Sequence, residues 1–111
     1  MTYKMKKIET EHMVRVICSD YPRRKRVLEK AQDRTDIVMA CSLLNKAVDD
    51  AIAEAYALTH AYAPNFGEIM RTDIAECRGF AHSPLSAVMC EGSYKKYKRM
   101  VKQGIATRLG L

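Results

Sequence analysis

The spacing of apolar residues between Ile37 and Tyr62 constrains the fold of this chain more than any other feature. Positions 37, 41, 44, 48, 51, 55, 58 and 62 hold Ile, Cys, Leu, Val, Ala, Ala, Leu and Tyr. The steps between them alternate between four and three, which is the spacing of one helix face and of a heptad seam. Residues 45, 46, 49, 50 and 54 are polar and fall off this seam. The pattern predicts one long helix, whose Ala-rich second half permits close approach of another helix.

Two interpretations of this seam stay open. The helix can pack inside its own domain as an amphipathic element, or it can pair with a second copy as a coiled coil. The stretch holds only about four heptads, which is near the minimum for a coiled coil. A homodimer through the long helix is therefore one of the partner hypotheses that the sequence leaves.

The segments before the long helix also show helical spacing. Apolar residues recur through residues 8–17, and the helix they predict is interrupted at Pro22, because Pro disfavours helix in the residue before it. Pro22 can itself open a second, short helix over residues 22–32. Thr35 or Asp36 is placed to cap the long helix that follows.

Two further helical segments follow residue 64. Asn65 can cap a helix over residues 66–79, and Gly79 is a natural stop just past its end. Ser83 and Pro84 read as an N-cap and a first helical residue that open a short segment over residues 84–90. The shared face of the first of these helices is predicted to consist of Phe66, Ile69, Met70, Ile74 and Cys77.

The fold class follows from these patterns and from the length of the chain. The chain has 111 residues, of which 48% are hydrophobic and 29% charged, so one globular domain is the default. No stretch shows sustained period-two alternation, and no Asn-Gly or Asp-Gly hairpin signal occurs. We predict a single all-α domain over residues 1–111 with about five helices. Residues 1–62 form its N-terminal helices and long central helix, and residues 65–111 form a C-terminal helix-turn-helix subregion.

Charge is distributed unevenly along the chain. Residues 1–30 carry nine Lys and Arg against four Asp and Glu, a balance of +5. Residues 31–92 carry four against nine (−5), and residues 93–111 carry six against none (+6). Basic ends around an acidic middle suggest a polyanionic partner such as nucleic acid, although solvated helix faces would give the same pattern.

The cysteines and the absence of long apolar runs point to one compartment. Cys18, Cys41, Cys77 and Cys90 form no Cys-x-x-Cys motif. No secretory signal and no run near the roughly 20 apolar residues of a membrane span is visible. The simplest expectation is a reduced cytoplasmic protein, with free thiols used as small core residues and no membrane partner.

The closing helix, predicted to begin near residues 91–93, separates into an apolar stripe and a basic face. Tyr94, Tyr97, Val101 and Ile105 are spaced by three, four and four, and basic residues cover the rest. A short helix, a tight turn and a basic amphipathic helix come in the order of a helix-turn-helix, whose last helix enters the major groove of DNA. Such a face also suits RNA, an acidic partner or a membrane surface, or it is simply solvated.

Candidate DNA contacts follow from position along this helix. Its first turns would lie nearest the base edges, whereas residues further along would meet phosphates. The base-contact candidates are Ser93, Lys95 and Lys96. The phosphate-contact candidates are Lys98, Arg99 and Lys102.

These residues resemble the end of the ArpU/RinA-like transcriptional regulators of bacteriophages and prophages, which are similar in pattern to sigma factor region 4. The resemblance lies in residues 91–94 (Glu-Gly-Ser-Tyr), 96–99 (Lys-Tyr-Lys-Arg) and 105–110 (Ile-Ala-Thr-Arg-Leu-Gly), with weaker support in residues 43–55 and 14–31. It implies a sigma-region-4-like helix-turn-helix, double-stranded DNA and RNA polymerase as partners, and control of transcription.

One departure from the family pattern concerns the turn. The family's first helix of the motif carries an Ile-Ala pair with a Gly at the turn, whereas here the segment is shorter and contains Pro84. Either the turn sits at Glu91 and Gly92, or the short helix has lost a turn.

Other chemistry finds little support. Cys77, His82 and Cys90 could be read as three zinc ligands, but their spacing matches no common zinc module. No nucleophile motif and no glycine-rich phosphate loop is present, so we expect no catalytic residue, no metal and no cofactor. The run from Arg23 to Arg26 either adds phosphate contacts or is the exposed face of a helix whose Val27 and Leu28 pack inward. The competing function is a helical oligomerisation or adaptor module that binds no DNA.

Overall fold

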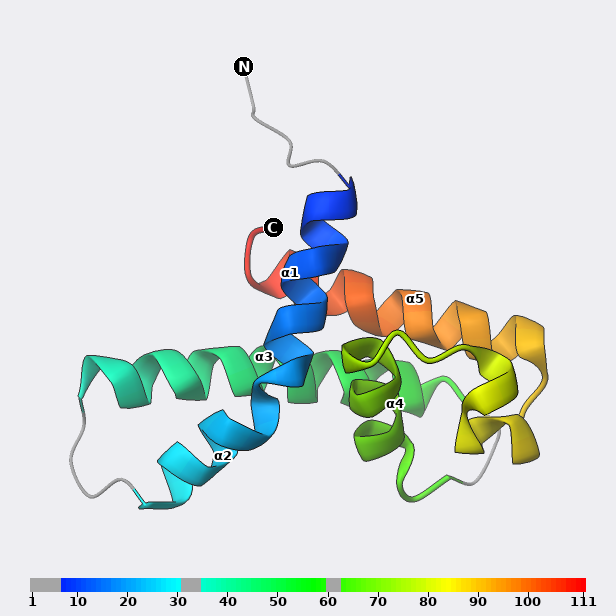
Figure 1. The fold of residues 1–111 in the computed structure, drawn as a ribbon, viewed down its shortest axis with the longest axis horizontal. Helices are drawn as coiled ribbons and strands as arrows, with labels where there is room; N and C mark the ends of the chain where they lie inside the picture. Colours follow the sequence, from blue (N-terminus) through cyan, green and yellow to red (C-terminus); the bar gives the residue numbers. More distant parts are fainter. Residues whose placement is uncertain (1–6, 31–34, 60–62) are drawn as a thin grey trace.

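Every regular element in the described part of the chain is a helix. The computed structural model describes residues 7–30, 35–59 and 63–111. These residues form five α-helices and two short 3-10 turns and contain no strand, which confirms the all-α prediction (Figure 1). The elements are α1 (Lys7–Ser19), α2 (Tyr21–Lys30), α3 (Asp36–Ala57), α4 (Phe66–Ala75), η1 (Phe80–His82), η2 (Pro84–Ala87) and α5 (Glu91–Arg108).

Helices α3 and α5 form the most extensive contact between elements. At 22 and 18 residues they are also the two longest helices among the described residues. Their backbones come close where Gly104 of α5 faces Ala51 of α3: a Cβ built on Gly104 would lie 3.0 Å from the Ala51 Cβ. The small residues in the second half of α3 therefore do permit the close helix approach that the sequence predicts.

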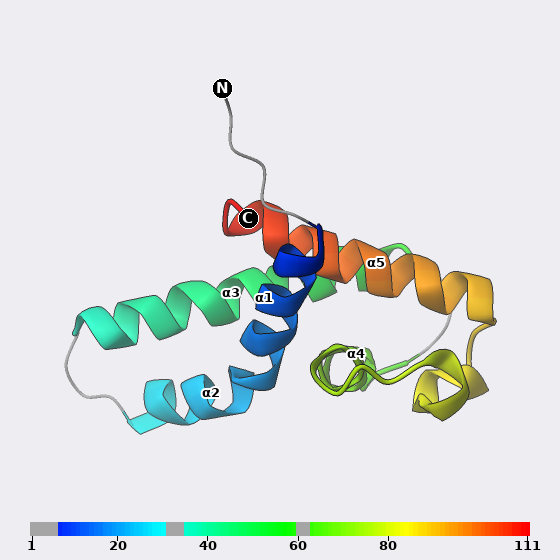
Figure 2. The ribbon, with the colours of Figure 1, turned by 45° about the horizontal axis from the view of Figure 1, so that its top comes forward.

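The remaining helices complete one core around this pair. Helix α1 packs on α4 and crosses α5 near the C-terminal end of α5. Helix α2 packs on α3 (Figures 1 and 2). The core includes Val48 of α3, Phe66 and Met70 of α4, and Val14 of α1, all almost completely buried. The predicted apolar stripe of α5 joins them, which confirms its inward orientation. The stripe residues are Tyr94, Tyr97, Val101 and Ile105.

The seam of α3 is buried only along its middle. Cys41, Val48 and Ala55 are buried, but Ile37 is 68% exposed and Leu58 is 55% exposed. The helix ends at Ala57 rather than continuing to Tyr62, which lies outside the described residues. Both ends of the seam are thus exposed, so an unbroken heptad spacing does not imply an unbroken buried face.

The start of α3 follows the predicted capping. Thr35 has extended backbone, and its side-chain oxygen accepts a hydrogen bond from the Val38 N–H at 3.2 Å. This bond satisfies one of the free N–H groups at the helix start. Of the two capping candidates, Thr35 is therefore the N-cap, and Asp36 is the first helical residue.

The end of α4 differs from the prediction. Cys77, expected on the buried face, is exposed and has a positive φ of 54° just after the helix. The Arg78 N–H donates to the Asp73 carbonyl at 2.8 Å, and the Cys77 N–H donates to the Ile74 carbonyl at 3.3 Å. This is the hydrogen-bond pattern of a Schellman motif, in which the residue after the helix adopts a left-handed conformation. The helix therefore stops before Gly79, because Cys77 takes the left-handed position.

The thiols divide into two environments. All four cysteines are free, but only Cys18 and Cys41 are buried core residues, whereas Cys77 and Cys90 are exposed. The exposed pair occupies helix ends: Cys77 follows α4, and Cys90 is the N-cap of α5. The expectation that all four serve as core residues is thus correct for two of them.

The connection between α4 and α5 contains two single 3-10 turns. The short helix predicted over residues 84–90 is η2, only four residues long. Its predicted N-cap is confirmed, because Ser83 Oγ accepts from the Leu85 N–H at 3.2 Å. Helix α5 begins at Glu91, so Gly92 lies inside it and the turn falls at residues 88–90. The alternative that places a turn at Glu91 and Gly92 is therefore wrong, because both residues are helical.

Candidate nucleic-acid interface

A buried polar cluster fixes the N-terminal half of α5 against α4 and the connection between them. Asp73, fully buried in α4, accepts hydrogen bonds at Oδ2 from Ser83 Oγ at 2.5 Å and from the Tyr94 hydroxyl at 2.8 Å. Arg78 places a guanidinium nitrogen 3.7 Å from the other carboxyl oxygen. A buried carboxylate needs such partners to offset its lost hydration. The cluster thereby sets the direction in which α5 leaves the connection.

The same environment changes the acidity of Tyr94. Burial raises the pKa of its phenol to about 12, and the hydrogen bond to Asp73 acts in the same direction. The neutral hydroxyl donates to the carboxylate, so loss of its proton would put two negative groups side by side in the core.

Lys98 is tied into this region and is not a free surface charge. Its Nζ donates to the carbonyl of Arg78 at 2.6 Å, and its side chain is half-buried. Burial lowers the pKa of the Lys98 ammonium, and the nearby charge of Lys102 lowers it further. Lys98 therefore anchors α5 to the end of α4 while its charge still contributes to the local field.

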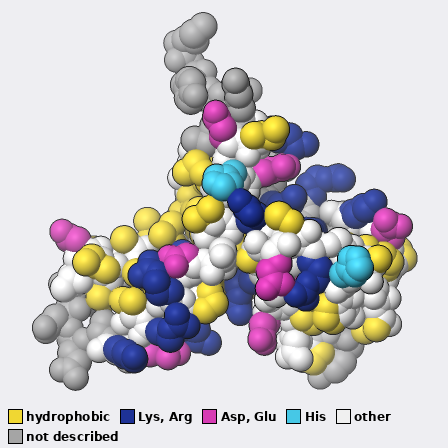
Figure 3. Space-filling view, viewed as in Figure 1, with side chains coloured by type: hydrophobic (Ala, Val, Ile, Leu, Met, Phe, Trp, Pro, Cys, Tyr) yellow, Lys and Arg dark blue, Asp and Glu magenta, His cyan; other side chains and the backbone are white. Residues whose placement is uncertain are grey.

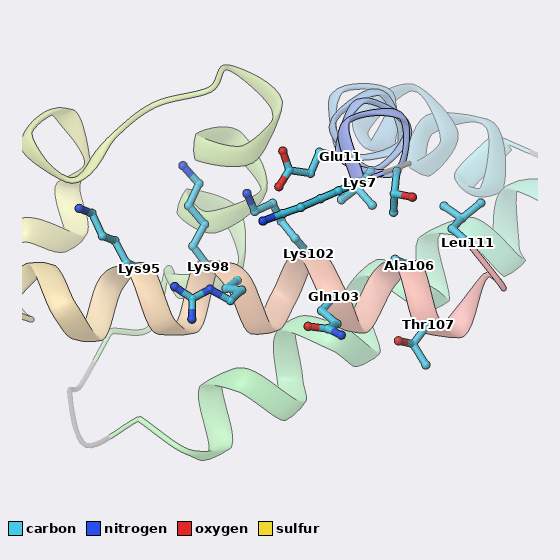
Figure 4. Close-up of a pocket in the computed structure, with 12 residues that line it drawn as sticks. Lys7, Glu11, Lys95, Lys98, Lys102, Gln103, Ala106, Thr107 and Leu111 are labelled. Atoms are coloured by element: carbon cyan, nitrogen blue, oxygen red, sulfur yellow. The ribbon is translucent and has the colours of Figure 1, made fainter. Parts of the chain in front are cut away.

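Three other cations lie on the same side of α5 as Lys98. Lys95 and Lys102 project from this side, as Figure 4 shows, and Arg99 lines the same groove. The Lys95 ammonium pairs with Glu91 at 3.0 Å, with both side chains well exposed. An exposed pair of this kind contributes little and opens readily.

Lys96 and Ser93 are placed differently. Lys96 is exposed but one residue beyond Lys95, so it is turned about 100° around the helix and does not line the groove. Its ammonium lies 5.8 Å from the centre of the Tyr97 ring. Ser93 is half-buried, with Oγ 3.3 Å from Cys90 Sγ. The six predicted contact residues therefore belong to one helix but not to one face.

A groove between α1 and α5 has a volume of about 560 Å³, and five of its lining residues are Lys or Arg (Figure 4). From α5 it receives four of the six predicted residues: Lys95, Lys98, Arg99 and Lys102. From α1 it receives Lys7, Thr10 and Glu11, which the sequence analysis did not single out. The basic balance of residues 1–30 was the available signal, but no local pattern could show that α1 crosses α5.

The basic run in α2 has a structural role that neither sequence interpretation includes. Arg24 is 3% exposed, and its Nε donates to Asn45 Oδ1 of α3 at 2.6 Å. Arg23 forms an ion pair with Asp20 at 2.6 Å on the surface. Arg24 thus joins α2 to α3, and no residue from Arg23 to Arg26 lines the groove.

The described residues contain no cluster of three or more His, Cys, Asp or Glu side chains that could hold a metal ion. None of the described helices is long and apolar enough to cross a membrane.

Comparison of the chain with protein-family models, with curated proteins and with solved structures finds no match in any of the three. The geometry and charge of the groove and of α5 therefore carry the functional interpretation.

Proposed function

We propose that this protein binds double-stranded DNA with sequence selectivity through α5. The motif would be a shortened helix-turn-helix, with η2 as its first element, residues 88–90 as its turn and α5 as the helix that enters the major groove. The resemblance to phage and prophage regulators supports control of transcription as the biological role, with RNA polymerase as a further partner.

The basic surface of α5 is the observation that carries this proposal. The helix and the residues after it contain six Lys and Arg, and Glu91 is the last acid in the chain. Within the described residues, no salt bridge engages Lys96, Arg99 or Lys102. Cations that form no salt bridge within the protein can bind a polyanion and release its counterions.

The contacts on DNA divide by position along α5. Ser93, Lys95 and Lys96 lie in the first turns and are the proposed base contacts. Arg99 and Lys102 lie further along and are the proposed phosphate contacts. Lys98, also proposed there, would act through its charge, because its ammonium already donates to the Arg78 carbonyl.

A binding titration with duplex DNA at two salt concentrations tests the proposal. We expect binding to random duplex that weakens steeply between about 50 and 200 mM salt, and tighter binding to a duplex selected from a random pool. No binding to either duplex at the lower salt would exclude the proposal.

Self-association as an adaptor module is the second candidate, and exposed apolar residues favour it. Met39 and Leu43 of α3 are 62% and 63% exposed, and Met13 and Val16 of α1 are exposed as well. Figure 3 shows hydrophobic side chains gathered over the part of α3 that extends past α1. Apolar surface of this kind commonly marks an interface.

Sedimentation decides whether a second copy covers this surface. A dimer that Leu43→Lys converts to a monomer, with unchanged helix content, would support self-association. A native monomer would leave DNA binding as the better function. The two functions are compatible, because the apolar surface and the basic groove do not share residues.

A further inference from the structure

We propose that the groove between α1 and α5 holds the phosphates of one nucleic-acid strand, so that α1 is a second contact element beside α5. This inference rests on the proposed DNA binding and adds Lys7 as a phosphate contact and Glu11 as a residue that weakens it. Figure 4 shows Lys7 extending from α1 toward Lys102, so the two ammonium groups face the same space.

The charge of the groove suits a chain of phosphates. Five of its lining residues are basic, and Glu11 is the only acid among them. The cations come from both walls: Lys7 stands on α1, and the other four stand on α5. A cation on each wall can contact a strand from both sides, which a single helix face cannot do.

Neutral hydrogen-bond donors complete the lining. Thr10, Gln103 and Thr107 border the groove, and no hydrogen bond among the described residues engages their side chains. Hydroxyl and amide groups are frequent phosphate contacts beside Lys and Arg. They give the groove donors at positions where a further cation is absent.

The floor of the groove favours phosphates over an acidic protein segment. Two of its three apolar lining residues, Val14 and Ala106, are only 1% and 8% exposed because they already pack in the core, and the third, Leu111, is half-buried. An acidic amphipathic helix would need apolar surface on which to bury its own apolar face. A phosphodiester backbone needs only cations and donors, which is what the rim supplies.

The position of the groove agrees with the division of contacts along α5. Helix α1 crosses the C-terminal half of α5, so Lys7 lies near Lys102 and away from the first turns (Figures 1 and 4). From Lys98 to Lys102, the proposed phosphate contacts, the helix rises about 6 Å, which spans about two phosphates of one strand.

Two substitutions in α1 test the inference in opposite directions. Lys7→Gln should reduce the slope of log affinity against log salt by about 0.9, equally for random and selected duplexes. Glu11→Gln should increase the affinity for both duplexes, because it removes the one acidic side chain among the lining residues. A gain in affinity cannot result from a loss of folding.

The matched control variants make the same Glu→Gln and Lys→Gln changes at positions outside the groove. Glu9 lies on α1 and Lys30 on α2, both exposed and neither lining the groove. Lys30→Gln should therefore change the salt slope less than Lys7→Gln does. Glu9→Gln should raise the affinity less than Glu11→Gln does.

Three results would overturn the inference. The parent could bind DNA while the groove variants show the same affinity and salt slope as the parent or as their controls. In that case α1 is not a contact element, while DNA binding through α5 stands. If the parent binds no DNA, the proposed function fails and this inference fails with it. If the parent binds poly-glutamate but no DNA, and Lys7→Gln weakens that binding, the groove serves an acidic protein instead.

Discussion

Gly104 of α5 and Ala51 of α3 meet so closely that a Cβ added to Gly104 would lie 3.0 Å from the Ala51 Cβ and 3.5 Å from its Cα. This contact joins the two helices with the most extensive packing and sets how near α5 approaches α3. Gly104→Val should therefore force the two helices apart and lower the free energy of unfolding by about 1–3 kcal/mol. Chemical denaturation measures this change. Gly92→Ala, at an open position of the same helix, should cause no loss; an equal loss in both variants would contradict the packing argument.

Cys77 is the one described non-glycine residue with a positive φ, at 54°. A left-handed conformation costs an L-residue about 1–2 kcal/mol relative to glycine, and glycine loses somewhat more chain entropy on folding. Cys77→Gly should thus stabilise the protein by about 0.5–1 kcal/mol, detectable as a higher melting temperature. Gly110 has φ 73° at the end of α5, so Gly110→Ala should have the opposite effect. A lower melting temperature for Cys77→Gly would mean that its side chain contributes more than its backbone strain.

Tyr94 should titrate far above an ordinary tyrosine. Burial, with the hydrogen bond to Asp73, raises its pKa to about 12, against about 10 in an unfolded chain. Because the folded chain holds this proton more tightly, the associated stability is fully present below pH 10 and is lost as pH rises from about 10 to about 12.

The ultraviolet absorbance of tyrosinate follows this titration directly. The chain has six tyrosines, and Tyr94→Phe should remove a component at the alkaline end of the curve. The same variant should destabilise the protein by about 1–3 kcal/mol, because Asp73 loses a buried hydrogen-bond donor. A curve that loses an ordinary component near pH 10 would place the Tyr94 hydroxyl in solvent.

A substitution of Lys96 distinguishes a contact to a base from a contact to a phosphate. It is exposed near the start of α5 and lies outside the groove. Lys96→Ala should reduce binding to the selected duplex more than binding to random duplex, by about 1–3 kcal/mol of discrimination. Competition titrations with both duplexes measure the difference. An equal loss on both duplexes would assign Lys96 to a phosphate.

The sequence predicts the five α-helices because their apolar spacing is local, but it does not predict where α3 and α4 end or that residues 84–87 form only a 3-10 turn. The spacing of Tyr94, Tyr97, Val101 and Ile105 fixes the buried face of α5, and Thr35 fixes the start of α3. Contacts between distant segments have no such local signal. Nothing in the run of basic residues in α2 distinguishes the buried Arg24 from the exposed Lys25 and Arg26, since its partner Asn45 lies 21 residues away.

The candidate site shows the same limit. The sequence names the four α5 residues that line the groove, but it also names Ser93 and Lys96, which do not line it. It does not show that Lys98 is held by the Arg78 carbonyl, or that Lys7 completes the groove, because both facts depend on how α4 and α1 cross α5.

The salt dependence of DNA binding by an Arg99→Gln, Lys102→Gln double variant tests the central claim most directly. Both side chains lie on the groove side of α5 without a salt-bridge partner among the described residues, and neither belongs to the buried stripe. The variant should fold like the parent, bind random and selected duplexes more weakly by the same factor, and show a salt slope smaller by about 2. A variant with the affinity and salt slope of the parent would contradict the assignment of this face of α5 to DNA.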